Sequence, residues 1–153
     1  MSEVANIETD PFLDALKDLL ISSEDIPELV EGNVAVWHHG VTDPDEDIAN
    51  SITKFGGISV LVYDLGGNVA DEDIIGAAAA IEFFVDTTKR NRRANTALRL
   101  GGEIRDAIMR LVHRNITLRN LSPNFDCRVT GYSPLADAEF AAWRITVSHS
   151  IYL

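Results

Sequence analysis

The stretch Ile58-Ser-Val-Leu-Val-Tyr-Asp64 decides the expected fold, because its β-branched and apolar residues are typical of a strand buried on both faces. Gly66-Gly67 is expected to break the chain after this strand, and residues 71–73 are expected to form an acidic turn. Alternating apolar residues within Ala77 to Thr87 predict a second strand. Because the two strands are adjacent in sequence, we expect them to pair as a hairpin.

The region before the hairpin carries repeated helix-start signals. Asp10-Pro11 offers a capping carboxylate followed by a proline that suits the first helical position. Apolar residues then recur at helical spacing, which predicts a helix from Asp10 to about Ile21. Asp43-Pro44 repeats the signal and predicts a shorter helix from about Pro44 to Lys54. Between the two helices, Val34 to Trp37 is expected to be a short strand.

The region after the hairpin contains the longest helical pattern, from Asn91 to Asn115. Gly101-Gly102 lies inside this pattern, so the helix is expected either to bend there or to meet another backbone closely. Phe125 to Tyr132 and Trp143 to Tyr152 are predicted to be the last strands. The second of them alternates apolar and polar residues, as a half-exposed antiparallel strand does.

These elements together predict an α+β fold in which a mostly antiparallel sheet packs against a long helix and shorter N-terminal helices. The chain has 153 residues, which suits one hydrophobic core, and it has no internal repeat or low-complexity linker. We therefore expect residues 1–153 to form a single domain, with residues 1–9 flexible.

Composition excludes several classes of protein. The chain is 46% apolar and 24% charged, which is ordinary for a globular domain. Its longest weakly polar run, Ile74 to Val85, is too short to cross a bilayer. The acidic N-terminus lacks a secretory signal pattern, so we expect the protein to stay in the cell that makes it. Cys127 is the only cysteine, which excludes an intramolecular disulfide and a Cys-rich metal site.

Charge is segregated along the chain, whose net charge is −11. Residues 1–88 contain two basic and 19 acidic residues, a net charge of −17, whereas residues 89–153 contain 11 basic and five acidic residues, a net charge of +6. Two such regions on separate surfaces would attract one another between copies of the chain. The alternative is that acidic loops and a basic helix are simply solvated.

The densest group of basic residues lies between positions 89 and 93, at the expected start of the long helix, although the helix dipole disfavours cations there. This placement indicates either an external partner, such as an acidic neighbouring subunit or a nucleic acid, or a solvated loop. We expect the partner to be a second subunit, with the acidic region around the first hairpin as the other half of the contact. The expected interface residues are Lys89, Arg90, Arg92, Arg93, Asp64, Asp71, Glu72 and Asp73.

The sequence contains no motif for phosphate binding or for a hydrolase nucleophile. Cys127 could pair with His113 or His149 in catalysis, but its position in a predicted strand favours a buried, inert thiol. Adjacent strand residues point to opposite faces, so His38-His39 is a poor metal site. The alternating acids from Asp43 to Asp47 are better explained by helix capping than by calcium binding. We therefore expect no enzymatic activity, no cofactor and no metal.

Four features together resemble the tail-terminator, or tail-completion, family of long-tailed phages. They are the strand Ile58-Ser-Val-Leu-Val-Tyr-Asp64, the strand Ile81-Glu-Phe-Phe-Val-Asp86, the helical stretch Ala97 to Ile108 and the polar-alternating strand after Trp143. The resemblance spans roughly residues 10 to 153 as an order of elements. The acidic segment Glu24 to Glu31 and the Gly101-Gly102 pair have no match in the family's pattern.

The resemblance implies a structural subunit of a ring, expected to be a hexamer, that caps the tail tube and stops its growth. Its other implied partners are the tail tube protein, the head-side connector or stopper and, in a contractile tail, the sheath. Genomic DNA would pass through an acidic lumen without specific binding. The implied location is the virion tail or neck, after assembly in the host cytoplasm, with no membrane involved.

Three alternatives remain at the level of sequence. The chain could be a head-tail stopper or another neck protein, a small enzyme that uses Cys127, or a regulator that binds nucleic acid through residues 89–93. Oligomeric mass and the salt dependence of binding would separate these classes.

Overall fold

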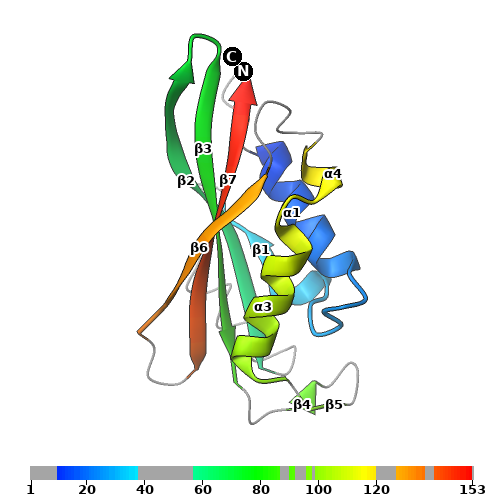
Figure 1. The fold of residues 1–153 in the computed structure, drawn as a ribbon. Helices are drawn as coiled ribbons and strands as arrows, with labels where there is room; N and C mark the ends of the chain where they lie inside the picture. Colours follow the sequence, from blue (N-terminus) through cyan, green and yellow to red (C-terminus); the bar gives the residue numbers. More distant parts are fainter. Residues whose placement is uncertain are drawn as a thin grey trace.

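The computed structural model describes residues 10–37, 57–86, 90–91, 96–97, 99–119, 127–136 and 140–152. A five-stranded sheet with the strand order β1-β2-β3-β7-β6 forms its centre. The helices α1, α3 and α4 lie on one side of this sheet (Figure 1). The sheet strands are β1 Val34–Val36, β2 Ile58–Asp71, β3 Ile74–Val85, β6 Arg128–Pro134 and β7 Ala141–Tyr152. The helices are α1 Asp10–Ser22, the short 3-10 helix η2 Glu31–Asn33, α3 Gly101–Val112 and α4 Ile116–Arg119.

The first helix, α1, begins at Asp10 and so confirms the predicted helix start. Its apolar stripe packs on the sheet, because Phe12, Leu13, Leu16 and Leu20 are each at most 3% exposed. Burying side chains of this size stabilises the fold by about 2 kcal/mol each, before the loss of conformational entropy.

The hydrophobic core lies between the helices and one face of the central strands. Ile81 and Phe83 of β3 and Ile145 and Val147 of β7 are fully buried there, together with Ile104 and Ile108 of α3. The alternation predicted for the last strand is confirmed, since the residues between its buried positions, such as Arg144 and Thr146, are partly exposed.

The predicted hairpin is confirmed, because β2 pairs with β3 in the antiparallel direction from Ile58 and Val85 to Asp71 and Ile74. The expected chain break at Gly66-Gly67 is wrong. Gly66 has a φ of 95°, and the register shifts between Asp64 and Gly66. The glycine therefore forms a bulge that the strand passes through, and the turn comes only at residues 72 and 73.

The predicted long helix from Asn91 to Asn115 is wrong. The helix α3 begins at Gly101, and two-residue strands, β4 Arg90–Asn91 and β5 Thr96–Ala97, pair in a small separate sheet before it. The helix ends at Val112 because Arg114 has a φ of 55°, a left-handed conformation. Asn115 then accepts the backbone N–H of Thr117 at 2.9 Å, which starts α4 as a separate turn.

The expected fold class is therefore also wrong. The sheet is mixed, since β1 pairs with β2 in the parallel direction from Val34 and Val60 to Val36 and Val62. The described helices are short, with 13 residues in α1 and 12 in α3, so no long helix covers the sheet in the part of the chain that the structure describes.

Several predictions fall wholly or partly outside the described residues. These are the helix from Pro44 to Lys54, the flexible residues 1–9 and the first part of the strand Phe125 to Tyr132. Within the described ranges, no helix has the length and apolar character needed to cross a bilayer.

Candidate functional site

The acidic half of the predicted interface lies on the β2–β3 hairpin. Asp71, Glu72 and Asp73 are exposed at its tip, whereas Asp64 is partly exposed further along β2. The Asp64 Oδ1 atom accepts the Gly66 N–H at 3.1 Å, so this carboxylate also supports the bulge. The structure thus gathers three of the four acidic residues at one tip and separates the fourth from them along the strand.

The hairpin also exposes apolar side chains. Every residue from Leu65 to Asp73 is exposed, and Leu65 and Val69 are 43% and 71% exposed. This end of the hairpin extends beyond the helical layer (Figure 1). Contacts with the core therefore do not explain why Leu65 and Val69 are apolar, and the combination of apolar and acidic side chains is suited to a partner surface.

The structure leaves the basic half of the predicted interface largely undescribed. Lys89, Arg92 and Arg93 lie outside the described residues, and only the backbone of Arg90 is described, paired with Ala97. The prediction that these four residues meet the acidic hairpin of a second subunit stays a prediction.

A second basic cluster, which sequence reasoning missed, forms where α3 ends and β6 begins. The backbone N–H of Arg114 donates to the Cys127 carbonyl at 2.7 Å, and that of Val129 donates to His113 Nδ1 at 3.0 Å. These bonds hold the end of α3 beside the start of β6. We call the four exposed residues brought together here the basic corner: Arg110, His113, Arg114 and Arg128.

Two arginines of the basic corner, Arg110 and Arg128, differ from the other arginines and the lysine for which an ion pair is described. Lys17, Arg99, Arg105 and Arg144 each form an ion pair with an acidic side chain. Across the described ranges, Arg110 and Arg128 have no such ion pair, so their charges are directed to solvent or to a partner. Arg110, His113 and Arg114 lie within five consecutive residues, and the fold brings Arg128 beside them.

A polar network crosses the sheet on the face opposite the core. Glu82 of β3 accepts hydrogen bonds from the Tyr63 hydroxyl and from the Arg144 guanidinium, the latter at 2.8 and 3.0 Å. Burial and the bond to Glu82 raise the pKa of Tyr63 to about 12. Tyr63 therefore stays protonated at neutral pH, and the network links three strands without an activated group.

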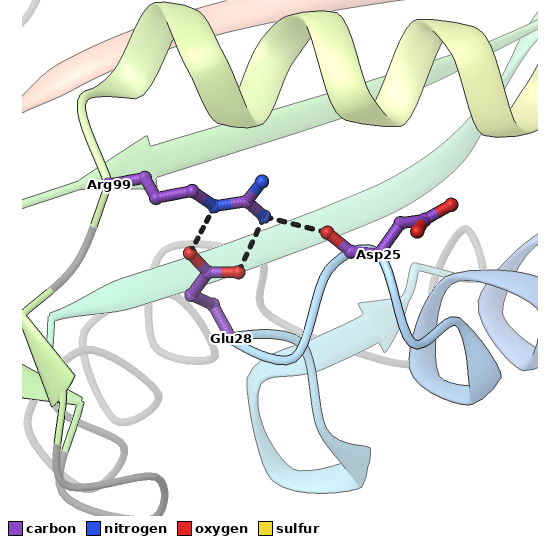
Figure 2. A network of polar contacts seen from close by, with 3 residues as sticks. All are labelled: Asp25, Glu28 and Arg99. Carbon is purple, nitrogen blue, oxygen red and sulfur yellow. Dashed lines mark hydrogen bonds and ion pairs between the residues drawn. The ribbon is translucent and has the colours of Figure 1, made fainter.

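A second polar network ties the segment before α3 to the loop after α1 (Figure 2). The Arg99 guanidinium donates to both Glu28 carboxylate oxygens at 2.7 Å and to the Asp25 carbonyl at 3.0 Å. Although burial acts to raise the pKa of Glu28, its hydrogen bonds to Arg99 and to backbone lower that pKa overall. An open cleft of about 520 Å³ lies beside this network, lined by Asp25, Arg99, Ala107, Arg110, Leu111 and Asn115.

The groups considered for catalysis are not arranged for it. Cys127 is fully buried, as predicted, and burial raises the pKa of its thiol to about 12, so it holds almost no thiolate at neutral pH. His149 is 1% exposed, while His113 is exposed and bonded to the backbone. Within the described residues, no group of three or more His, Cys, Asp or Glu side chains could hold a metal ion.

Comparison with known proteins does not identify a family for this chain. No protein-family model matches the chain, and no curated protein matches it.

Proposed function

We propose that this protein is a structural subunit of a phage tail-terminator ring, which caps the tail tube, stops its growth and joins the tail to the head-side connector. The proposal rests on the resemblance of its strands to that family, and of the helical stretch only over α3, which begins at Gly101. The structural observation that best supports the proposal is the projecting β2–β3 hairpin.

The hairpin supports assembly because its end contributes little to the core. Its residues from Leu65 to Asp73 are all exposed, yet they lie in strands that stay paired, through two register shifts, as far as Asp71 and Ile74. An ordered element with exposed apolar and acidic side chains is typical of a contact surface on a rigid scaffold.

The distribution of charge supports the same proposal. The hairpin tip is acidic, and the basic corner lies on a different part of the molecule, where Arg128 opens β6. Two different surfaces of opposite charge favour head-to-tail contacts, which close into a ring when the rotation between subunits permits.

Deletion of the gene in its phage tests this function. We expect capsids that package DNA, together with tails of uncontrolled length or tails that do not join heads. Loss of a head stopper should instead let packaged DNA leak, and loss of an enzyme should leave particle architecture intact. Electron micrographs that show normal, joined tails in the deletion phage would contradict the terminator assignment.

A further inference from the structure

The imidazole of His149 is enclosed between the sheet and helix α1. It is 1% exposed, and its ring stacks on Phe12 of α1 with the two ring planes 5° apart. The strand pairings place Gly67 and Ala77 in its row of the sheet, so its neighbours there have almost no side chain. In the part of the chain that the structure describes, neither ring nitrogen has a hydrogen-bond partner. A protonated ring is therefore unsatisfied where it lies.

Few charges act on this buried ring. Burial lowers its pKa from 6.5 to about 4, although the Asp64 carboxylate, one row away on the same face of the sheet, acts in the opposite direction. On α1, Asp14 and Asp18 are exposed, and Lys17 pairs with Glu31. Of the described side chains, only Asp64 shifts this pKa through its charge. The closed structure therefore keeps the ring neutral down to mild acid.

The two elements that enclose His149 are held in place differently. Its own strand, β7, is paired along its whole length with β3 and is paired on its other side with β6. Helix α1 is held by the burial of apolar side chains, and its one described hydrogen bond to another element joins Lys17 to the exposed side chain of Glu31. Movement of α1 therefore hydrates the ring at a lower cost than removal of β7 from the sheet.

We propose that α1 is an acid-sensitive element of this fold: protonation of His149 detaches the helix from the sheet while the strands stay paired. The device lies within one chain and does not depend on assembly into a ring. Detachment exposes the apolar side chains of α1 and the sheet face that they cover, all of which are buried at neutral pH. Mild acid thus uncovers an apolar surface.

Hydrogen exchange of the wild-type protein at pH 7 and pH 5 tests this device. The ring has a pKa of 6.5 when α1 is detached and of about 4 when α1 is closed. Detachment should therefore become about 20-fold more favourable between pH 7 and pH 5. Protection factors, which are corrected for the intrinsic pH dependence of exchange, should fall by this factor for the amides of α1.

Urea separates detachment of α1 from unfolding of the whole chain, because its effect scales with the surface that is exposed. At pH 5, exchange of the amides from Leu16 to Leu20 in α1 should depend only weakly on urea. Exchange of the amides from Ala79 to Phe83 in β3 should be slower and should depend strongly on urea. If both sets share the same strong urea dependence, α1 opens only by global unfolding and the device is wrong.

Two variants isolate the charge of His149. His149→Phe keeps an aromatic ring against Phe12, and His149→Gln keeps a polar side chain that cannot gain a proton. Both should lack the loss of α1 protection between pH 7 and pH 5. Lys17→Gln is the matched control, because it removes the described ion pair of α1 and should keep the full pH effect.

The variants also show what would overturn the assignment. An undiminished acid loss of α1 protection in either folded His149 variant would mean that other groups cause it. Loss of the pH effect in Lys17→Gln would assign it to the ion pair instead. If one His149 variant does not fold, the other variant and the urea dependence of the wild type decide the matter.

Discussion

At the scale of single residues, the buried side chain of His149 makes the stability of the fold depend on pH. It lies on β7 with 1% of its surface exposed, and its ring stacks on Phe12 with the centroids 3.8 Å apart. Burial lowers the pKa of His149 from 6.5 to about 4, although the Asp64 carboxylate and the Ser150 backbone act in the opposite direction. The folded protein therefore holds this imidazole neutral where the unfolded chain would protonate it.

This shift predicts a loss of stability in mild acid. The contribution of His149 to stability is fully present above its unfolded pKa of 6.5 and is lost as the pH falls towards its folded value of about 4. The loss amounts to about 3 kcal/mol across that window. Chemical denaturation from pH 7 to 4 measures it, with His149→Phe as the control that keeps the stacking. Equal pH slopes in the two proteins would contradict this prediction.

Cys127 is predicted to be inert in the native protein. It is fully buried, and its Sγ atom faces the Val112 carbonyl at 4.0 Å. A thiol reagent should therefore label the native protein only as fast as the chain opens, and should label it rapidly in denaturant. Rapid native labelling would show that the thiol is accessible and would reopen its role as a nucleophile.

At the scale of elements, Gly101 fixes the start of α3 against β7. A Cβ atom at Gly101 would lie 2.4 Å from Cζ3 and 2.6 Å from Cη2 of Trp143. At Gly102 the nearest atom would be Arg105 Nη2 at 3.7 Å, an ordinary contact. The two adjacent glycines therefore have different roles in the fold.

The difference predicts opposite effects of the same substitution. Gly101→Ala should destabilise the protein by about 1–3 kcal/mol, because the helix or the Trp143 ring must shift. Gly102→Ala should be neutral or should stabilise by up to about 1 kcal/mol, because alanine favours the helix. Denaturant unfolding of both variants checks this pair. A larger loss at Gly102 than at Gly101 would refute the assignment.

The elements with local signals could be predicted from sequence. The Asp10-Pro11 start, the hairpin and the alternation after Trp143 each depend on neighbouring residues, and the structure contains all three. The prediction of a long helix was wrong because the apolar spacing continues through Gly101-Gly102 without interruption. The packing of Gly101 on Trp143 is a long-range contact, which no local pattern indicates. The prediction of a chain break at Gly66-Gly67 was wrong for a related reason, since a glycine with positive φ is suited equally to a turn and to a bulge.

At the scale of the whole molecule, one part of the candidate site could be predicted from local sequence and the other part could not. The acidic hairpin tip is contiguous in sequence and was predicted. The basic corner was missed, because Arg128 joins it only through two hydrogen bonds, from the Arg114 N–H to the Cys127 carbonyl and from the Val129 N–H to His113 Nδ1. The strand order of the sheet depends on long-range pairing, which no local pattern specifies.

The mass of the purified protein tests the central claim, that this chain is a self-assembling structural subunit, most directly. Light scattering over a range of concentrations should give a closed multimer, expected to be six copies of the 16.8 kDa chain, and electron micrographs of the same sample should show rings. A mass of 16.8 kDa at every concentration and salt condition, with no rings, would contradict the account.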